Sequence, residues 1–168
     1  PLSLAGHSTP SYEGNVISEN DHQCIRISSG IEQNTTYKNI DLPYVIRGVD
    51  VSVSSGSTLT IEPGVIVKLD HDIDDVNIYG NIDIQATQAE PVVFTSYHDD
   101  SFGGDTDGNG EQSTIYEWGS VYISANSTGN VISNCIFRYG GGDDYDNGAL
   151  DIHGDSNSVT NCVFEHND

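Results

Sequence analysis

Apolar and polar residues alternate with a period of two along most of this chain. The alternation is clear in VDVSVSS (49–55), TLTIEPGVIVKL (58–69), VNIYGNIDIQA (76–86), PVVFTS (91–96) and GSVYISA (119–125), and Gly, Asn, Asp and Pro separate these runs. A period of two places successive side chains on opposite faces of a β-strand, whereas the spacing of an amphipathic helix is absent. The pattern therefore predicts an all-β chain.

A segment near the C-terminus is repeated. ISNCIFRYGGG (132–142) and VTNCVFEHND (159–168) align with an offset of 27 residues, which matches Asn134 with Asn161, Cys135 with Cys162 and Phe137 with Phe164. A third copy, GNVISEN, aligns its Asn15, Val16, Ser18 and Asn20 with Asn161, Cys162, Phe164 and Asn167 when a gap of one residue is allowed before Asn20.

A repeat of this length without helices favours a parallel β-solenoid, in which each coil stacks on the next. Equivalent residues then form columns, so we expect an amide ladder of Asn15, Asn134 and Asn161 at one corner. The Cys and Phe columns would fill the interior, with Cys135 and Cys162 as free buried thiols. An antiparallel sandwich with accidental similarity is the alternative.

Several segments, taken in order, resemble one known family. They are LPYVIRGVDVSVSSGSTLTIEPGVIVKL, GNIDIQATQAEPVVFTSYHDDSFGGDTDGNG, WGSVYISA and CIFRYGGG, and they look like the pectin-lyase-like repeat proteins of bacterial and archaeal cell surfaces. The resemblance implies a single-stranded right-handed parallel β-helix of about six coils in an extracellular or cell-surface protein. The length and composition predict one domain over residues 1–168. Such coils serve adhesins, filaments, glycan-binding proteins and polysaccharide lyases alike, so the resemblance is specific for the fold only.

Charge narrows the classes of partner. The chain of 168 residues has 5 Lys and Arg against 26 Asp and Glu, a formal net charge of -21. This balance excludes nucleic acid, because its phosphates must be met by cationic side chains, and disfavours an anionic membrane. A compact body this acidic repels itself, so divalent ions or a saline habitat are implied. A hydrophobic fraction of 35% argues against a disordered acidic tail.

The cysteine count and the candidate export signals say less about disulfides and cellular location than the charge says about partners. Three residues, Cys24, Cys135 and Cys162, are too few for a disulfide scaffold, and no apolar run is long enough for a membrane span. The start, PLSLAGHSTP, lacks the charged head and apolar stretch of a signal peptide and is typical of a mature or excised end. Two sequons, at Asn34 and Asn126, permit glycosylation if the chain is exported.

The stretch DTDGNG (105–110) offers oxygen ligands at every second position, followed by a glycine, as calcium loops do. The bidentate Glu of a complete calcium loop is missing, because Tyr116 takes its place. The expected ligands are Asp105, Asp107, Asn109, Glu111, Asp99 and Asp100. An ion there would clamp an insertion at about 98–117 that leaves the coils after FTSY and returns at Trp118; a solvated acidic loop without metal is the alternative. The acidic groups at 70–75 and 143–146 are interpreted as solvated corners, with binding of further calcium as the alternative.

Catalytic equipment is sparse. A polysaccharide lyase would need a cation beside its carboxylates, which only Arg138 near Asp143 and Asp144, or Lys68 near Asp70, could supply. Both cations more simply neutralise carboxylates, and the six histidines lack metal-ligand spacing and are interpreted as surface residues. If Tyr122, Tyr139 and Tyr145 cluster, they would stack on sugars, so a carbohydrate-active protein remains the alternative function.

The two ends of the chain suggest assembly. It begins in an apolar-alternating strand and stops after a core strand, without a polar capping coil or helix. We expect a structural or adhesive protein, supported by calcium, that stacks head to tail with Leu2, Leu4, Val163 and Phe164 at the junction. A fragment of a longer β-helix, flanked by its own neighbouring coils, is nearly as well supported.

Overall fold

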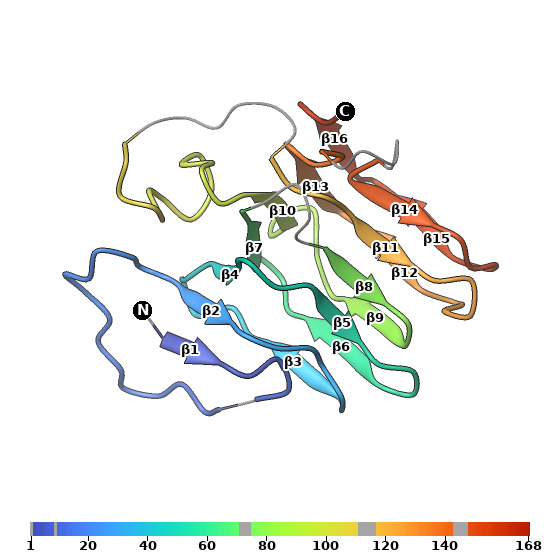
Figure 1. The fold of residues 1–168 in the computed structure, drawn as a ribbon, viewed down its shortest axis with the longest axis horizontal. Helices are drawn as coiled ribbons and strands as arrows, with labels where there is room; N and C mark the ends of the chain where they lie inside the picture. The colour runs from blue at the N-terminus through green and yellow to red at the C-terminus, as the bar shows by residue number, and fades with distance from the viewer. Residues whose placement is uncertain (1, 9, 71–74, 111–116, 143–147) are drawn as a thin grey trace.

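The chain folds as a parallel β-solenoid, and the part of it that the structure describes contains no helix (Figure 1). The computed structural model describes residues 2–8, 10–70, 75–110, 117–142 and 148–168. Its strands are β1 (Leu2–Leu4), β2 (Ile25–Ile27), β3 (Thr35–Tyr37), β4 (Tyr44–Ile46), β5 (Val51–Val53), β6 (Thr58–Ile61), β7 (Ile66–Leu69), β8 (Val76–Ile78), β9 (Asn81–Ile84), β10 (Val92–Ser96), β11 (Val121–Ile123), β12 (Val131–Ser133), β13 (Cys135–Arg138), β14 (Leu150–Ile152), β15 (Ser158–Thr160) and β16 (Val163–Glu165). Every strand pair is parallel, so the predicted solenoid is confirmed and the antiparallel sandwich is wrong.

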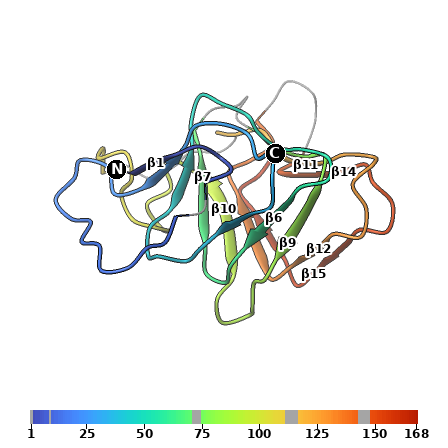
Figure 2. The ribbon, with the colours of Figure 1, turned by 90° about the horizontal axis from the view of Figure 1, so that it is seen from below.

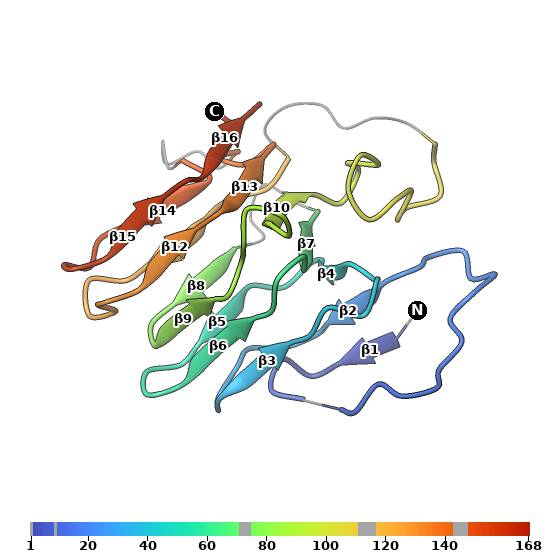
Figure 3. The ribbon, with the colours of Figure 1, turned by 180° about the vertical axis from the view of Figure 1, so that it is seen from behind.

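Three parallel sheets form the walls of the solenoid. Sheet A has the order β1-β2-β4-β7-β10-β13-β16, sheet B the order β14-β11-β8-β5, and sheet C the order β15-β12-β9-β6-β3. Seen from behind, the strands of sheet C lie side by side in this order (Figure 3). From β4 onward the chain visits sheets A, B and C in turn, and it makes about 5 turns in all, close to the predicted six.

The 27-residue repeat corresponds to one turn of the solenoid. Phe137 pairs with Phe164, and their rings stack with centroids 5.0 Å apart; Phe94, one turn earlier, stacks on Phe137 at 5.1 Å. Cys135 and Cys162 occupy the next column and are free, the first buried and the second half-buried. The sequence alignment thus gave the correct register for these two turns.

The amide ladder lies at a different corner from the one predicted. Asn134 and Asn161 do take equivalent left-handed conformations, with φ of 53° and 54°, but no hydrogen bond between their side chains is among those of the described residues. The ladder instead connects Asn81, Asn130 and Asn157: the Nδ2 of Asn130 donates to Asn157 Oδ1 at 2.8 Å, and the Nδ2 of Asn81 donates to Asn130 Oδ1 at 3.3 Å.

The third repeat copy is wrong. GNVISEN lies in a strandless excursion between β1 and β2, where Asn15 is exposed and Val16 is 88% exposed. The alignment put Ser18 in the phenylalanine column, and a serine cannot fill the volume that Phe137 and Phe164 occupy in the true turns.

Two excursions leave the solenoid on the same side. The segment between β1 and β2 and the segment after β10 both lie beside sheet A (Figure 2).

The second excursion ends at Trp118, which is fully buried and donates its Nε1–H to Arg138 O at 2.8 Å. A Cβ on Gly140 would approach the Trp118 ring to 2.7 Å, so a glycine is required opposite Trp118 in the next turn. We call the described part of the second excursion, residues 97–110, the acidic loop.

Candidate functional site

The acidic loop lies over a column of outward-facing side chains on sheet A. Side chains alternate along a strand, so the residues between the buried core positions point away from the solenoid axis. The strand registers align these residues from β1 to β16 as Ser3, Arg26, Val45, Lys68, Thr95, Arg138 and Glu165. Three of the 5 Lys and Arg residues therefore stand in one column of a chain whose net charge is -21.

Lys68 is the main attachment of the loop to the solenoid. Its side chain is fully buried, and Nζ donates to Asp99 O at 2.9 Å, Gly104 O at 2.7 Å and Thr106 Oγ1 at 2.6 Å. An ammonium group has three N–H bonds, so all of its donors are used. Burial lowers the pKa of Lys68, although the neighbouring carboxylates, Asp99 first, oppose this shift. A lysine thus performs the ordering of loop backbone that the sequence suggested for a metal ion.

Asp99 faces inward and pairs with the same column. Its carboxylate is fully buried and accepts hydrogen bonds from Thr95 Oγ1 at 2.6 Å, Arg138 Nη1 at 3.1 Å and the backbone N–H of Ser101 at 3.0 Å. Both oxygens therefore have protein partners. The structure places this predicted metal ligand on the inner side of the loop, apart from the other carboxylates.

Arg138 completes the inner contacts. Its Nε lies 3.0 Å from Glu165 Oε1, and its guanidinium lies over the ring of Phe102, 5.3 Å from the centroid, and over the ring of Tyr139 at 4.9 Å. The predicted partners of Arg138, Asp143 and Asp144, lie outside the described residues. Because Arg138 is 9% exposed and Lys68 is fully buried, neither cation faces solvent as a base for a polysaccharide substrate would.

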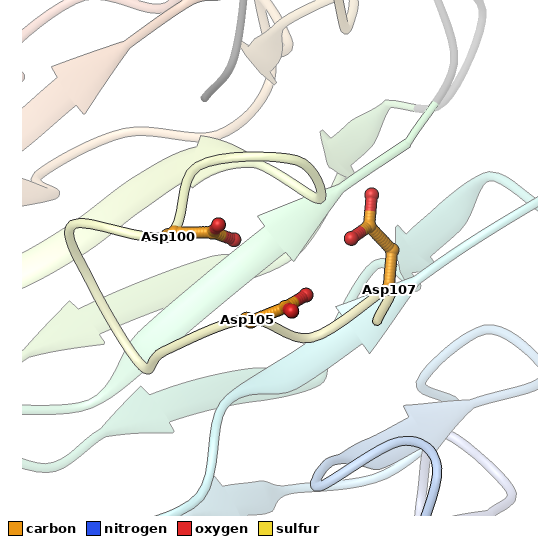
Figure 4. A group of neighbouring side chains, drawn as sticks. All are labelled: Asp100, Asp105 and Asp107. Atoms are coloured by element: carbon orange, nitrogen blue, oxygen red, sulfur yellow. The ribbon is translucent and has the colours of Figure 1, made fainter. Parts of the chain in front are cut away.

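Three carboxylates form the outer side of the loop. Asp100, Asp105 and Asp107 each offer an oxygen, and these oxygens all lie within 4.8 Å of one another. Figure 4 shows the three side chains around a common space. Of the other predicted ligands, Asn109 donates its Nδ2–H to Asp107 Oδ2 at 2.6 Å, and Glu111 lies outside the described residues. We call Asp100, Asp105 and Asp107 the carboxylate cluster.

Local backbone bonds shape the carboxylate cluster. Asp105 accepts from the N–H groups of Gly108 at 2.7 Å and Gly110 at 3.2 Å, and both glycines have positive φ. Asp100 Oδ1 is buried and has no hydrogen-bond partner in the described part of the chain. Burial raises the pKa of Asp100, and the neighbouring Asp105 adds to this effect. Convergent carboxylates that repel one another are the donor set that a hard divalent cation prefers.

His98 connects the carboxylate cluster to the solenoid, which sequence reasoning missed. Its Nδ1 contacts Asp107 Oδ2, and its Nε2 lies 3.2 Å from Asp70 Oδ1. Burial alone raises the pKa of Asp107, but the hydrogen bond from His98 and those from the loop outweigh it and hold this pKa below its ordinary value. Asp70 itself pairs with Arg47 Nε at 2.5 Å, so Arg47 takes the role that the sequence analysis gave to Lys68. The only available signal was the position of His98 directly before two aspartates.

The coil formed by β14, β15 and β16 exposes apolar residues at one end of the solenoid, and we call it the C-terminal coil. Val159, Val163 and Phe164 are 41%, 47% and 50% exposed. At the opposite end, Leu2 and Leu4 are half-buried, and Tyr12 packs against the same core. The excursion around Tyr12 therefore covers part of the N-terminal end, which the sequence analysis regarded as bare.

The remaining predicted residues do not gather at the carboxylate cluster. Tyr122 lies on sheet B beside Tyr79, whereas Tyr139 is buried against Arg138, and Tyr145 lies outside the described residues. The sequon residues Asn34 and Asn126 are both exposed, and Asn34 Oδ1 accepts a hydrogen bond from the N–H of Thr58 at 3.0 Å.

Comparison with known proteins gives no further assignment. No protein-family model matches the chain, and no curated protein or solved structure is significantly similar to it. Within the described residues, the structure has no helix long and apolar enough to cross a membrane.

Proposed function

We propose that the chain is a structural or adhesive segment of an extracellular, pectin-lyase-like right-handed β-helix, and that its C-terminal coil binds a further parallel coil. The observation that carries this proposal is the exposure of residues that are buried one turn earlier. Phe164 is 50% exposed, whereas Phe137, its equivalent in the preceding turn, is fully buried. A further coil would cover Phe164 in the way that the C-terminal coil covers Phe137.

The backbone supports the same proposal. The strands β14, β15 and β16 each end the order of their sheet among the described strands. An edge strand presents unpaired N–H and C=O groups, and an edge beside exposed apolar side chains favours pairing with another strand. A parallel coil would satisfy these backbone groups and extend the Phe94, Phe137 and Phe164 stack.

Two sources could supply that coil. A second copy would contribute its N-terminal end, where Leu2, Leu4, Tyr12 and Ile17 line a cavity of about 470 Å³. Repeated contacts of this head-to-tail kind do not close and would build a filament. The following coils of a longer chain would instead build a continuous stalk. The chemistry of the contact is the same in both cases.

Calcium binding at the carboxylate cluster is part of the proposal. The support is the convergence of Asp100, Asp105 and Asp107 within 4.8 Å and the buried, unpartnered Oδ1 of Asp100. Carbonyl groups and water would complete the six to eight oxygen ligands that calcium takes. Because Lys68 already attaches the loop, the ion would neutralise the outer carboxylates rather than order the whole excursion.

Sedimentation velocity over a range of concentrations, with calcium present, tests the assembly. Association that rises with concentration and is lost in Phe164→Asp supports the second-copy source. Val131→Asp is the matched control, because Val131 is 53% exposed on the side of the solenoid and the variant adds the same charge. Equal loss in both variants would refute a specific end contact. If the wild type stays monomeric, the stalk form remains testable by linking two copies in tandem: native-state hydrogen exchange at the first copy's β14, β15 and β16 must then slow.

Glycan binding is a second candidate, favoured by a row of rings on sheet B. Tyr79 and Tyr122 have centroids 6.3 Å apart, and Tyr122 and His153 have centroids 5.2 Å apart. His153 Nε2 lies 3.0 Å from Asp151 Oδ2, so polar groups lie beside the rings. Aromatic faces with a few placed polar groups suit sugar rings. Retention on insoluble polysaccharide that Tyr122→Ala abolishes would support this candidate, and unchanged retention would refute it.

A further inference from the structure

A cavity on the outer face of sheet A differs in charge from the rest of the chain. It has a volume of about 320 Å³ and lies where β1, β2 and β4 meet the two excursions. Arg26 and Arg47 line it together with His22, although the chain has only 5 Lys and Arg residues against 26 Asp and Glu. Among the described residues, none that lines this cavity is an aspartate or glutamate. The cavity is therefore a basic site in a strongly acidic molecule.

The floor of the cavity is apolar and firmly built. Cys24, Val45 and Tyr97 form a small buried cluster on the outer face of the sheet, with exposures of 5%, 2% and 3%. Tyr97 is the first residue of the acidic loop, and its hydroxyl donates to Thr106 O at 3.3 Å. The ring of His22 is held on the same carbonyl group, with Nδ1 2.9 Å from Thr106 O. Both excursions thus contribute to walls that rest on the sheet.

The two arginines differ in what they already bind. Arg47 uses its Nε for Asp70 at 2.5 Å, and its guanidinium lies over the Tyr97 ring, 4.9 Å from the centroid. Arg26 has one hydrogen bond, from Nη2 to Arg47 O at 3.3 Å, and no ion pair with a carboxylate of the described residues. A guanidinium has five donors, so Arg26 keeps most of its capacity for an anion.

We propose that this cavity binds a small organic carboxylate with a short apolar body. The carboxylate would lie on the guanidinium of Arg26, which matches it in planar, two-pronged geometry. The apolar part would rest on Cys24, Val45 and Tyr97. The volume is at the lower end of the range for small-molecule sites, which restricts the ligand to a compact molecule. The inference does not require end-to-end assembly, because the binding is measured on the single chain, although Leu2 lines both this cavity and the cavity at the N-terminal end.

The test uses 4-fluorobenzoate as the probe and 4-fluorobenzamide as its neutral isostere, observed by fluorine NMR in about 0.15 M salt, where long-range repulsion from the acidic surface is screened. We expect saturable binding of the benzoate, with the benzamide about tenfold weaker. Amide shifts at Ser3, Arg26 and Val45 should locate the ligand. Absence of saturable benzoate binding, equal binding of the two probes, or shifts confined to other strands would overturn the proposal.

The second test compares benzoate binding by Arg26→Gln with binding by its control, Lys38→Gln. Both residues are exposed and both variants remove one positive charge, but Lys38 does not line the cavity. We expect Arg26→Gln to weaken benzoate binding about tenfold and Lys38→Gln to leave it unchanged. Equal weakening in the two variants would show only a response to net charge and would refute the site. The thermal midpoint of each variant verifies that the fold is kept.

Discussion

The two sides of the acidic loop hold charge in opposite ways. On the inner side, Lys68 and Arg138 are buried and donate hydrogen bonds to Asp99, and Arg138 Nε, which has no hydrogen-bond partner among the described residues, lies 3.0 Å from Glu165 Oε1 in an ion pair. On the outer side, Asp100, Asp105 and Asp107 lie within 4.8 Å of one another without a Lys or Arg side chain paired to them among the described ion pairs. The inner carboxylate is paired by protein side chains, whereas the outer carboxylates would be neutralised only by the calcium ion that we propose. The order of the loop and the proposed cation binding therefore depend on different residues of the same short segment.

The sharpest test of the inner side is Lys68→Met, which keeps an unbranched side chain of nearly the same length and removes its charge. The carbonyls of Asp99 and Gly104 and the hydroxyl of Thr106 would lose their buried donor. We expect the free energy of unfolding to fall by about 3 kcal/mol. Urea denaturation measures the loss, and Lys38→Met is the control for an exposed lysine. A loss below about 1 kcal/mol would show that the loop is attached by other contacts.

Exchanging single carboxylates compares the two sides directly. Asp99→Asn leaves the guanidinium of Arg138 without its buried counter-charge, so we expect a loss of about 2 kcal/mol in the free energy of unfolding. Asp100→Asn removes one of three repelling charges and should change stability by less than about 0.5 kcal/mol without calcium. The two substitutions are chemically identical, and urea denaturation of both is the measurement. Equal effects would contradict the difference between the inner and outer sides.

Calcium should act on the outer side alone. At about ten times its dissociation constant the ion would stabilise the chain by about 1.4 kcal/mol, visible as a rise in the thermal midpoint. The double variant Asp105→Asn with Asp107→Asn should lose this rise but keep its resistance to proteolysis near Lys68. Magnesium, which demands a stricter geometry, is the control ion. No rise in the wild type would leave the cluster as a solvated acidic surface.

The smallest effect is expected at His98, which connects Asp107 of the carboxylate cluster to Asp70 at the end of β7. Its side chain is 35% exposed and contacts Asp70 and Asp107, so its contribution resembles that of a surface ion pair. His98→Gln should lower the free energy of unfolding by about 0.5 kcal/mol. Calcium titration of the same variant shows whether His98 orients the Asp107 carboxylate. A changed calcium affinity would show that it does, and an unchanged calcium affinity would show that His98 makes only a packing contact.

Two features could be predicted from residue type and short spacing alone: the register of the last two coils and the convergence of Asp105 with Asp107. The match of Cys135 and Phe137 with Cys162 and Phe164 placed two coils in register, because core columns need the same apolar residues at each level. Spacing also brought Asp105 and Asp107 together, since both belong to one short stretch. Neither inference needed contacts between distant segments.

The buried role of Lys68 in attaching the acidic loop could not be predicted from residue type or spacing. An outward-facing lysine on a strand is normally solvated, and its partners are 31 to 38 positions away in the chain. The inward orientation of Asp99 has the same cause, because Arg138 is 39 positions away and reaches it only after a full turn of the solenoid. The false copy at Asn15 shows the opposite error, in which a short match satisfied the polar positions but not the core volume.

One contact between the excursions affects how the molecule unfolds. In a solenoid each coil touches only its neighbours, so coils can melt one after another from either end. His22 precedes β2 and Thr106 follows β10, yet His22 Nδ1 lies 2.9 Å from Thr106 O, across the intervening strands β4 and β7 of sheet A. This contact ties turns that are not adjacent, so the loss of an early turn is felt several turns away. We therefore expect the unfolding of the coils between β2 and β10 to be coupled through the two excursions rather than to proceed one coil at a time.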